Sequence, residues 1–153
     1  MVDLKSKFWL YLSIDALIVI IAIITPAITA HFTSGIAFVW MWGFSIAPAS
    51  VVVLIPEYII LTGIIFLILN IISVVILIFT ALMSRKDIKN RKILQGLLLI
   101  CGIILIAGSL IYMTIIENSI GVSWGYHKFN FGSIGPFIAG VLSFIGVWLS
   151  RKI

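Results

Sequence analysis

The sequence predicts a mainly α-helical membrane protein, a four-helix transmembrane bundle that carries a small extracellular antiparallel β-sheet. Hydrophobic residues make up 63% of the chain and charged residues only 10%, whereas a soluble domain has about 25% charged residues. Four apolar runs are long enough to cross a bilayer. Between the first two runs, one segment alternates large and small residues with the period of a strand. With 153 residues, we expect a single membrane domain over residues 1–153.

Four segments meet the length requirement for membrane-spanning helices. A helix needs about 20 apolar residues to cross a hydrocarbon core about 30 Å thick. The predicted spans are about 8–30, 57–83, 93–116 and 132–150. Helices are expected because an open strand would leave backbone groups without hydrogen bonds in lipid.

Basic residues lie almost entirely on one side of these spans. Of the ten lysines and arginines, only Lys128 falls in a loop on the other side. The positive-inside rule therefore places both termini and the 84–92 loop in the cytoplasm, and segments 31–56 and 117–131 outside the cell. We expect a multi-pass protein of the plasma membrane. Orientation explains the net charge of +5, so the bilayer, and not nucleic acid, is the expected partner of the basic residues.

The first external segment contains a pattern that is typical of a strand. In residues 36–46, large side chains at even positions alternate with mostly smaller ones at odd positions. A period of two predicts an extended strand with one bulky face. Pro48 then predicts a turn, and the β-branched run 51–55 predicts a second strand that leads into the second span. The alternative is a re-entrant loop, or one that skims the membrane surface.

A third strand is expected in residues 122–129, where aromatic residues again alternate with smaller ones. It would pair with the predicted hairpin, because three strands with an apolar face are more stable than two. The predicted interaction surface is the aromatic face of this sheet. Its members are Phe38, Trp40, Trp42, Phe44, Trp124 and Tyr126.

Small residues form a stripe along one face of the fourth span. The stripe consists of Gly132, Gly135, Ala139, Ser143 and Gly146. Small residues let helices approach closely in lipid, where helix association depends on packing because the hydrophobic effect does not drive it. The stripe predicts a helix-packing face, either inside the bundle or between subunits.

Asp15 is an acid inside the first span. An acid at the centre of a spanning helix costs about 2.5–3.5 kcal/mol on insertion scales and is usually paired or functional. It is interpreted either as a neutral acid hydrogen-bonded inside the bundle or as a carboxylate hydrated from the inner side. The alternative function is a small proton-coupled transporter that uses Asp15.

Metal and enzyme chemistry have little support in the sequence. His31, Glu57, Glu117 and His127 all fall near the outer side and could ligate zinc or copper, but none has close ligand spacing. We therefore expect no metal site and no cofactor. The single cysteine, Cys101, excludes chemistry that needs cysteine pairs. Without a phosphate-binding loop or a nucleophile paired with a base, we expect no enzymatic activity.

The start of the fourth span, "KFNFGSIGPFIAG", has an aromatic, one residue, an aromatic and then glycine. Together with four spans and a long strand-rich first loop, this resembles the claudin superfamily, which includes the peripheral myelin protein family and the auxiliary subunits of AMPA-type glutamate receptors. The matching positions are Phe129, Phe131, Gly132 and Gly140, with Trp42 in the place of the family's loop tryptophan.

The chain departs from the claudin pattern in its first external loop. The family's Gly-Leu-Trp motif is followed by a pair of cysteines, and this loop has none. The resemblance implies a non-enzymatic protein that acts by association. It would assemble with itself, mediate adhesion, or serve as an accessory subunit of a larger membrane complex.

Overall fold

The computed structural model describes residues 4–32, 35–42, 45–46, 57–86, 91–120 and 126–152. The elements, in chain order, are α1 (Leu4–Ile24), β1 (Ile28–Phe32), β2 (Gly35–Val39), β3 (Ser45–Ile46), α2 (Glu57–Lys86), α3 (Arg91–Ile120), β4 (Tyr126–Phe129) and α4 (Phe131–Ser150). Each of the four helices is long and apolar enough to cross a membrane. The prediction of a mainly helical chain with a small antiparallel sheet is confirmed.

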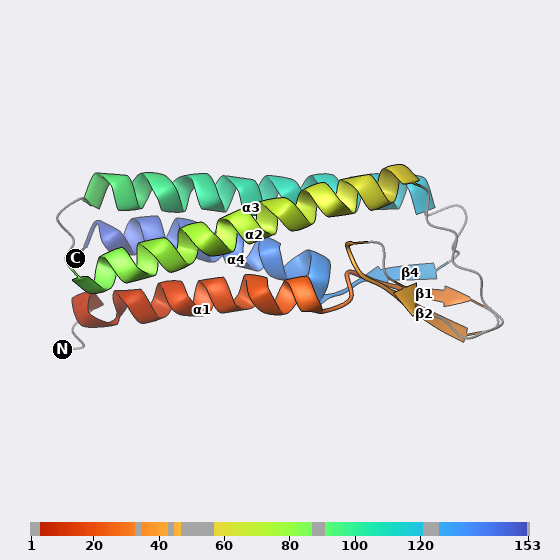
Figure 1. Ribbon diagram of the computed structural model, residues 1–153, viewed down its shortest axis with the longest axis horizontal. Helices are drawn as coiled ribbons and strands as arrows, with labels where there is room; N and C mark the ends of the chain where they lie inside the picture. Colours follow the sequence, from red (N-terminus) through yellow and green to blue (C-terminus); the bar gives the residue numbers. More distant parts are fainter. Residues whose placement is uncertain are drawn as a thin grey trace.

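The four helices form a closed ring. Each packs on its neighbours in chain order, and α4 packs back on α1 (Figure 1). The bundle core contains Leu12, Val19, Leu77, Leu98 and Leu105, all with no exposed surface. Isoleucines and leucines also cover the outside of the helices, which is the pattern of a surface that faces lipid.

The helices differ in length, and this difference makes room for the sheet. Helices α2 and α3 have 30 residues each, whereas α1 has 21 and α4 has 20. At a rise of 1.5 Å per residue, the long pair extends about 45 Å and the short pair about 30 Å. The sheet lies beyond the ends of α1 and α4, beside the extra turns of α2 and α3 (Figure 1).

The first span ends earlier than the sequence predicts. Helix α1 ends at Ile24, and residues 28–30 of the predicted span instead belong to β1. Pro26 has no N–H to donate to a helix, which favours an end at this point. The chain then gains its hydrogen bonds from β2 and β4, which flank β1 on both sides.

The sheet has the strand order β3-β2-β1-β4, and all three pairings are antiparallel. The prediction of one strand over residues 36–46 is wrong. Strand β2 ends at Val39, a turn follows at Met41–Trp42, and β3 pairs back onto β2. The predicted strand at 51–55 lies outside the described residues.

The third predicted strand is confirmed for β4, although it pairs with β1 and not with the hairpin that the sequence indicated. The inner face of the sheet then packs against the extra turns of α2 and α3. This second core contains Ala27, Ile28, Ala30, Val39, Met41, Ile59, Phe66, Tyr112 and Ile116.

Candidate functional site

The outer face of the sheet carries large apolar side chains. Directly paired residues of antiparallel strands share a face. One row across the four strands therefore contains Ile46, Phe38, Thr29 and Lys128. In the next row, Ile36 lies opposite His31. These rows face away from α2 and α3, because Ala37 and Val39, which alternate with Ile36 and Phe38 along β2, are buried on the opposite face.

Three of these side chains form what we call the outer sheet patch: Ile36, Phe38 and Ile46. Their exposed fractions are 46%, 41% and 53%. The bulky face of β2 thus points outward and its small face inward. The sequence pattern predicted the alternation of β2, but it does not by itself say which face is buried.

The structure describes the side chains of three members of the predicted aromatic set, Phe38, Trp40 and Trp42, and these three lie in different settings. Trp40 donates from Nε1 to the carbonyl oxygen of Ile24 at 2.9 Å and so ties the sheet to the end of α1. Trp42 is exposed at the turn after β2. Tyr126 belongs to β4, but its side chain is outside the part of the chain that the structure describes. Phe44 and Trp124 are also outside the described residues.

Met41 anchors the turn between β2 and β3 to the bundle. Its side chain is 1% exposed, and its sulfur accepts a hydrogen bond from Nδ2 of Asn70 at 3.7 Å. Its carbonyl oxygen lies directly against Gly63, where a Cβ atom would collide with it. In the alternating pattern of residues 36–46, Met41 occupies one of the odd positions, and the pattern gives it no role. That Gly63 faces this turn can be seen only in the folded structure.

Asp15 lies in a closed polar centre to which each helix contributes one residue: Asp15, Ser73, Cys101 and Ser143, all with no exposed surface. Ser143 Oγ donates to Asp15 Oδ2 at 2.8 Å, and the Cys101 thiol donates to the carbonyl oxygen of Ser73 at 3.7 Å. Asp15 Oδ1 has no hydrogen-bond partner among the described groups. Of the two interpretations that the sequence allows for Asp15, this arrangement agrees with an acid that is hydrogen-bonded inside the bundle.

The small-residue stripe of α4 packs inside the bundle. All of its members, Gly132, Gly135, Ala139, Ser143 and Gly146, are buried. A Cβ added to Gly135 would meet Ala22 of α1 at 2.8 Å, and one added to Gly146 would meet Leu98 of α3 at 3.4 Å. The stripe therefore serves intramolecular contacts, and it is not exposed to a second subunit.

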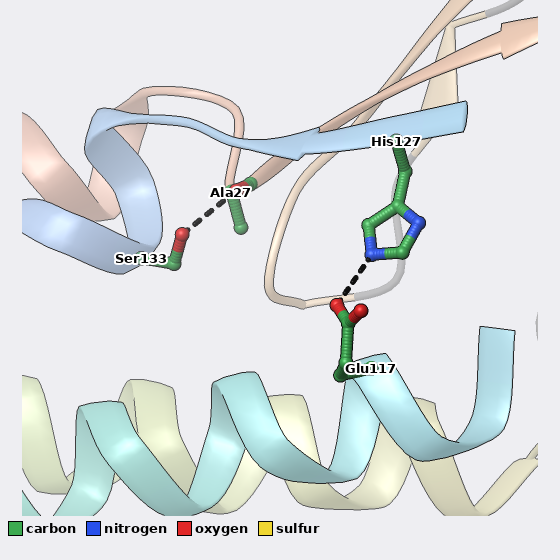
Figure 2. Close-up of polar contacts among 4 residues, drawn as sticks. All are labelled: Ala27, Glu117, His127 and Ser133. Carbon is green, nitrogen blue, oxygen red and sulfur yellow. Dashed lines mark hydrogen bonds and ion pairs between the residues drawn. The ribbon is translucent and has the colours of Figure 1, made fainter. Parts of the chain in front are cut away.

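The candidate metal ligands lie on different faces and elements. His127 Nε2 and Glu117 Oε2 are 3.0 Å apart and connect β4 to α3 (Figure 2). His31 is on the opposite face of the sheet from His127, and Glu57 is exposed at the first residue of α2. Within the described ranges, no three His, Cys, Asp or Glu residues form a group that could hold a metal ion.

Hydrogen bonds also fix the junction between the sheet and α4. Ser133 Oγ donates to the carbonyl oxygen of Ala27 at 2.9 Å (Figure 2). The backbone N–H of Asn130 donates to the same carbonyl at 2.8 Å, and its side chain bonds to Thr29. The start of α4 is thus joined to β1, which helps to set the position of the sheet on the bundle.

No protein-family model matches the chain, and no curated protein matches its sequence.

Proposed function

We propose that the protein is a non-enzymatic, claudin-like protein of the plasma membrane that acts by association. The outer sheet patch is the contact surface, and the partner is a second copy or another membrane protein for which this chain is an accessory subunit. The observation that carries the proposal is the outward orientation of Ile36, Phe38 and Ile46. Apolar groups exposed together outside a bilayer are stabilised when a partner covers them.

The position of the patch favours a neighbour in the same membrane. The strands run roughly along the long axis of the bundle, and the inner face of the sheet covers α2 and α3 (Figure 1). The outer face is therefore directed sideways, parallel to the plane of a membrane crossed by the bundle. A laterally placed partner could contact the patch and the helices together.

The distribution of lysines and arginines supports an extracellular sheet with both termini in the cytoplasm. The end of the bundle opposite the sheet carries exposed basic residues in α1, α2 and α3 and directly after α4, namely Lys7, Arg85, Arg91, Lys92, Arg151 and Lys152. In the described part of the sheet end, Lys128 is the only lysine or arginine. This asymmetry agrees with the positive-inside rule.

The claudin-like assignment is supported by layout. Four spanning helices and a strand-rich segment between the first two helices match the arrangement that the resemblance implies. Without a loop disulfide, the hydrogen bond from Trp40 to Ile24 and the buried Met41 hold the sheet on the bundle. The alternative function, proton-coupled transport through Asp15, has less support because its carboxylate is fully enclosed.

The proposal can be tested by making the patch polar. Phe38→Ser and Ile46→Ser replace apolar side chains that are 41% and 53% exposed and that belong to neither buried core, so the protein should still fold. Tyr58→Ser is the matched control, because Tyr58 is 53% exposed at the same end of the bundle but belongs to α2. We expect the wild type and the control to show cross-linked complexes in native membranes, and the two patch variants to lose most of them.

The complexes would be identified by mass spectrometry, which separates self-assembly from an accessory role. The stoichiometry would be measured by light scattering in mild detergent. A wild-type protein that stays monomeric and yields no specific cross-linked partner would refute the proposal, as would patch variants that associate like the wild type.

A further inference from the structure

A shallow, open cavity of about 310 Å³ lies between the last turns of α3 and strand β4, lined by Met113, Thr114, Glu117, Asn118 and Phe129. This volume falls at the lower end of the range of about 300–1,000 Å³ that is usual for small-molecule sites. Phe129 is paired with Ile28 on the inner face of the sheet. The cavity is thus separate from the outer sheet patch.

Glu117 and the end of α3 both contribute negative charge to the cavity. Glu117 lies in the last turn of α3, which ends at Ile120 and has no basic residue in that turn. The C-terminal end of a helix carries a partial negative charge, so the helix and the carboxylate reinforce each other. Lys128 lies on the opposite face of β4, in the row of Thr29 and Phe38.

Glu117 is held in place while part of it stays accessible. His127 Nε2 lies 3.0 Å from Glu117 Oε2, and this contact directs the carboxylate toward β4 (Figure 2). The Glu117 side chain is nevertheless 63% exposed. A carboxylate has acceptor sites on both oxygens, so one contact to His127 leaves capacity for a cation.

The remaining walls are suited to a cation that carries apolar groups. Phe129 contributes an aromatic ring, held edge-on to the His127 ring at a centroid distance of 5.7 Å. Met113 adds a polarizable thioether, and Asn118 adds an exposed amide. A carboxylate beside an aromatic ring is a combination that recognises alkylated ammonium groups, through charge and cation–π attraction.

The cavity is also placed at the depth of lipid head groups. Helix α4 has 20 residues and extends about 30 Å, the thickness of a hydrocarbon core. Phe129 precedes this helix by two positions, so it lies at the boundary where head groups begin.

We propose that this cavity binds an organic ammonium group, with Glu117 as the counter-ion and Phe129 as the aromatic wall. Two sources present this chemistry: the choline head group of a phospholipid and a free quaternary ammonium solute. The site goes beyond the proposed association, and it does not require the outer sheet patch.

The test uses the full-length protein in a maltoside detergent, which carries no ammonium group. Binding of tetramethylammonium and of dihexanoyl-phosphatidylcholine is measured by titration calorimetry, with dihexanoyl-phosphatidylglycerol as the lipid control. Glu117→Gln should weaken binding at least about tenfold, because the charged acceptor is lost while the amide can still contact His127. Glu57→Gln, an exposed acid at the same end of the bundle, should bind like the wild type.

Phe129→Leu provides a second variant that keeps apolar packing but removes the aromatic ring. It should weaken binding several-fold, and it decides the question if Glu117→Gln does not fold. If both ammonium probes bind, a free quaternary ammonium ion is sufficient as the ligand. If only phosphatidylcholine binds, the ligand is the lipid head group. The inference is overturned if neither ammonium probe binds, if phosphatidylglycerol binds equally well, or if a folded variant binds with unchanged affinity.

Discussion

Ser143 is the donor that stabilises the buried acid of α1. Its hydroxyl bonds to Asp15 Oδ2 at 2.8 Å, and Oδ1 of the same carboxyl has no partner among the described groups. Ser143→Ala should leave Asp15 without this donor inside an apolar core. We expect the free energy of unfolding to fall by about 1 kcal/mol, the usual size of such a bond between membrane helices. Thermal unfolding in detergent would measure it.

Ser109→Ala is the matched control for this prediction. Ser109 is equally buried, but its hydroxyl bonds to the carbonyl of Leu105 in its own helix at 2.7 Å. Alanine is the better helix former, so stability should change little. If Ser109→Ala costs as much as Ser143→Ala, the contact with Asp15 has no special role.

Single residues show what the sequence could and could not predict about the polar centre. Asp15 was identified because an acid inside an apolar run is costly anywhere in the bundle. Its partner, Ser143, is a member of the predicted α4 stripe, but the sequence does not identify it as the hydrogen-bond donor to Asp15. Which helix faces which is set by packing between segments 128 positions apart, and no local pattern carries that information.

At the scale of elements, the contact between α2 and the turn after β2 depends on Gly63. A Cβ at this position would collide with the carbonyl oxygen of Met41. Gly63→Ala must therefore push the turn away from α2 and disturb the burial of Met41. We expect a loss of about 1–3 kcal/mol, typical of overpacking in a rigid core, together with faster proteolysis of the sheet.

Gly96→Ala tests whether this effect is local. A Cβ on Gly96, in α3, meets no atom within 4 Å. The change should therefore be neutral, or stabilising by up to about 1 kcal/mol through helix propensity. Equal effects of the two substitutions on unfolding and proteolysis would show that the turn does not depend on Gly63.

The elements of the sheet were predicted less well than the helices, for a physical reason. Residues 28–30 of β1 directly continue the first hydrophobic run, so the sequence places them in the span, although Pro26 marks the boundary. In residues 36–46 the alternation of large and small residues continues past the end of β2. There, however, contacts with Ile24 and Asn70 position Trp40 and Met41. Tertiary contacts thus replaced the strand geometry that the pattern indicated.

At the scale of the whole molecule, unequal helix lengths couple the bundle to the sheet. The short helices α1 and α4 match a hydrocarbon core of about 30 Å, and the longer α2 and α3 extend past it. Their extra turns supply the apolar wall on which the sheet packs. A disulfide is therefore not needed to hold the strands, because the sheet and the helices share one core.

This architecture predicts that the two ends of the bundle lie on opposite sides of the membrane. The one native cysteine, Cys101, is completely buried, so an introduced cysteine can be labelled cleanly. Glu57→Cys lies at the exposed first residue of α2, at the sheet end of the bundle and outside the outer sheet patch, and Arg151→Cys follows α4 at the other end. In intact cells, a membrane-impermeant maleimide should label Glu57→Cys, whereas Arg151→Cys should react only after permeabilisation. The reverse pattern would invert the orientation inferred from the basic residues, and labelling of both in intact cells would be incompatible with four crossings.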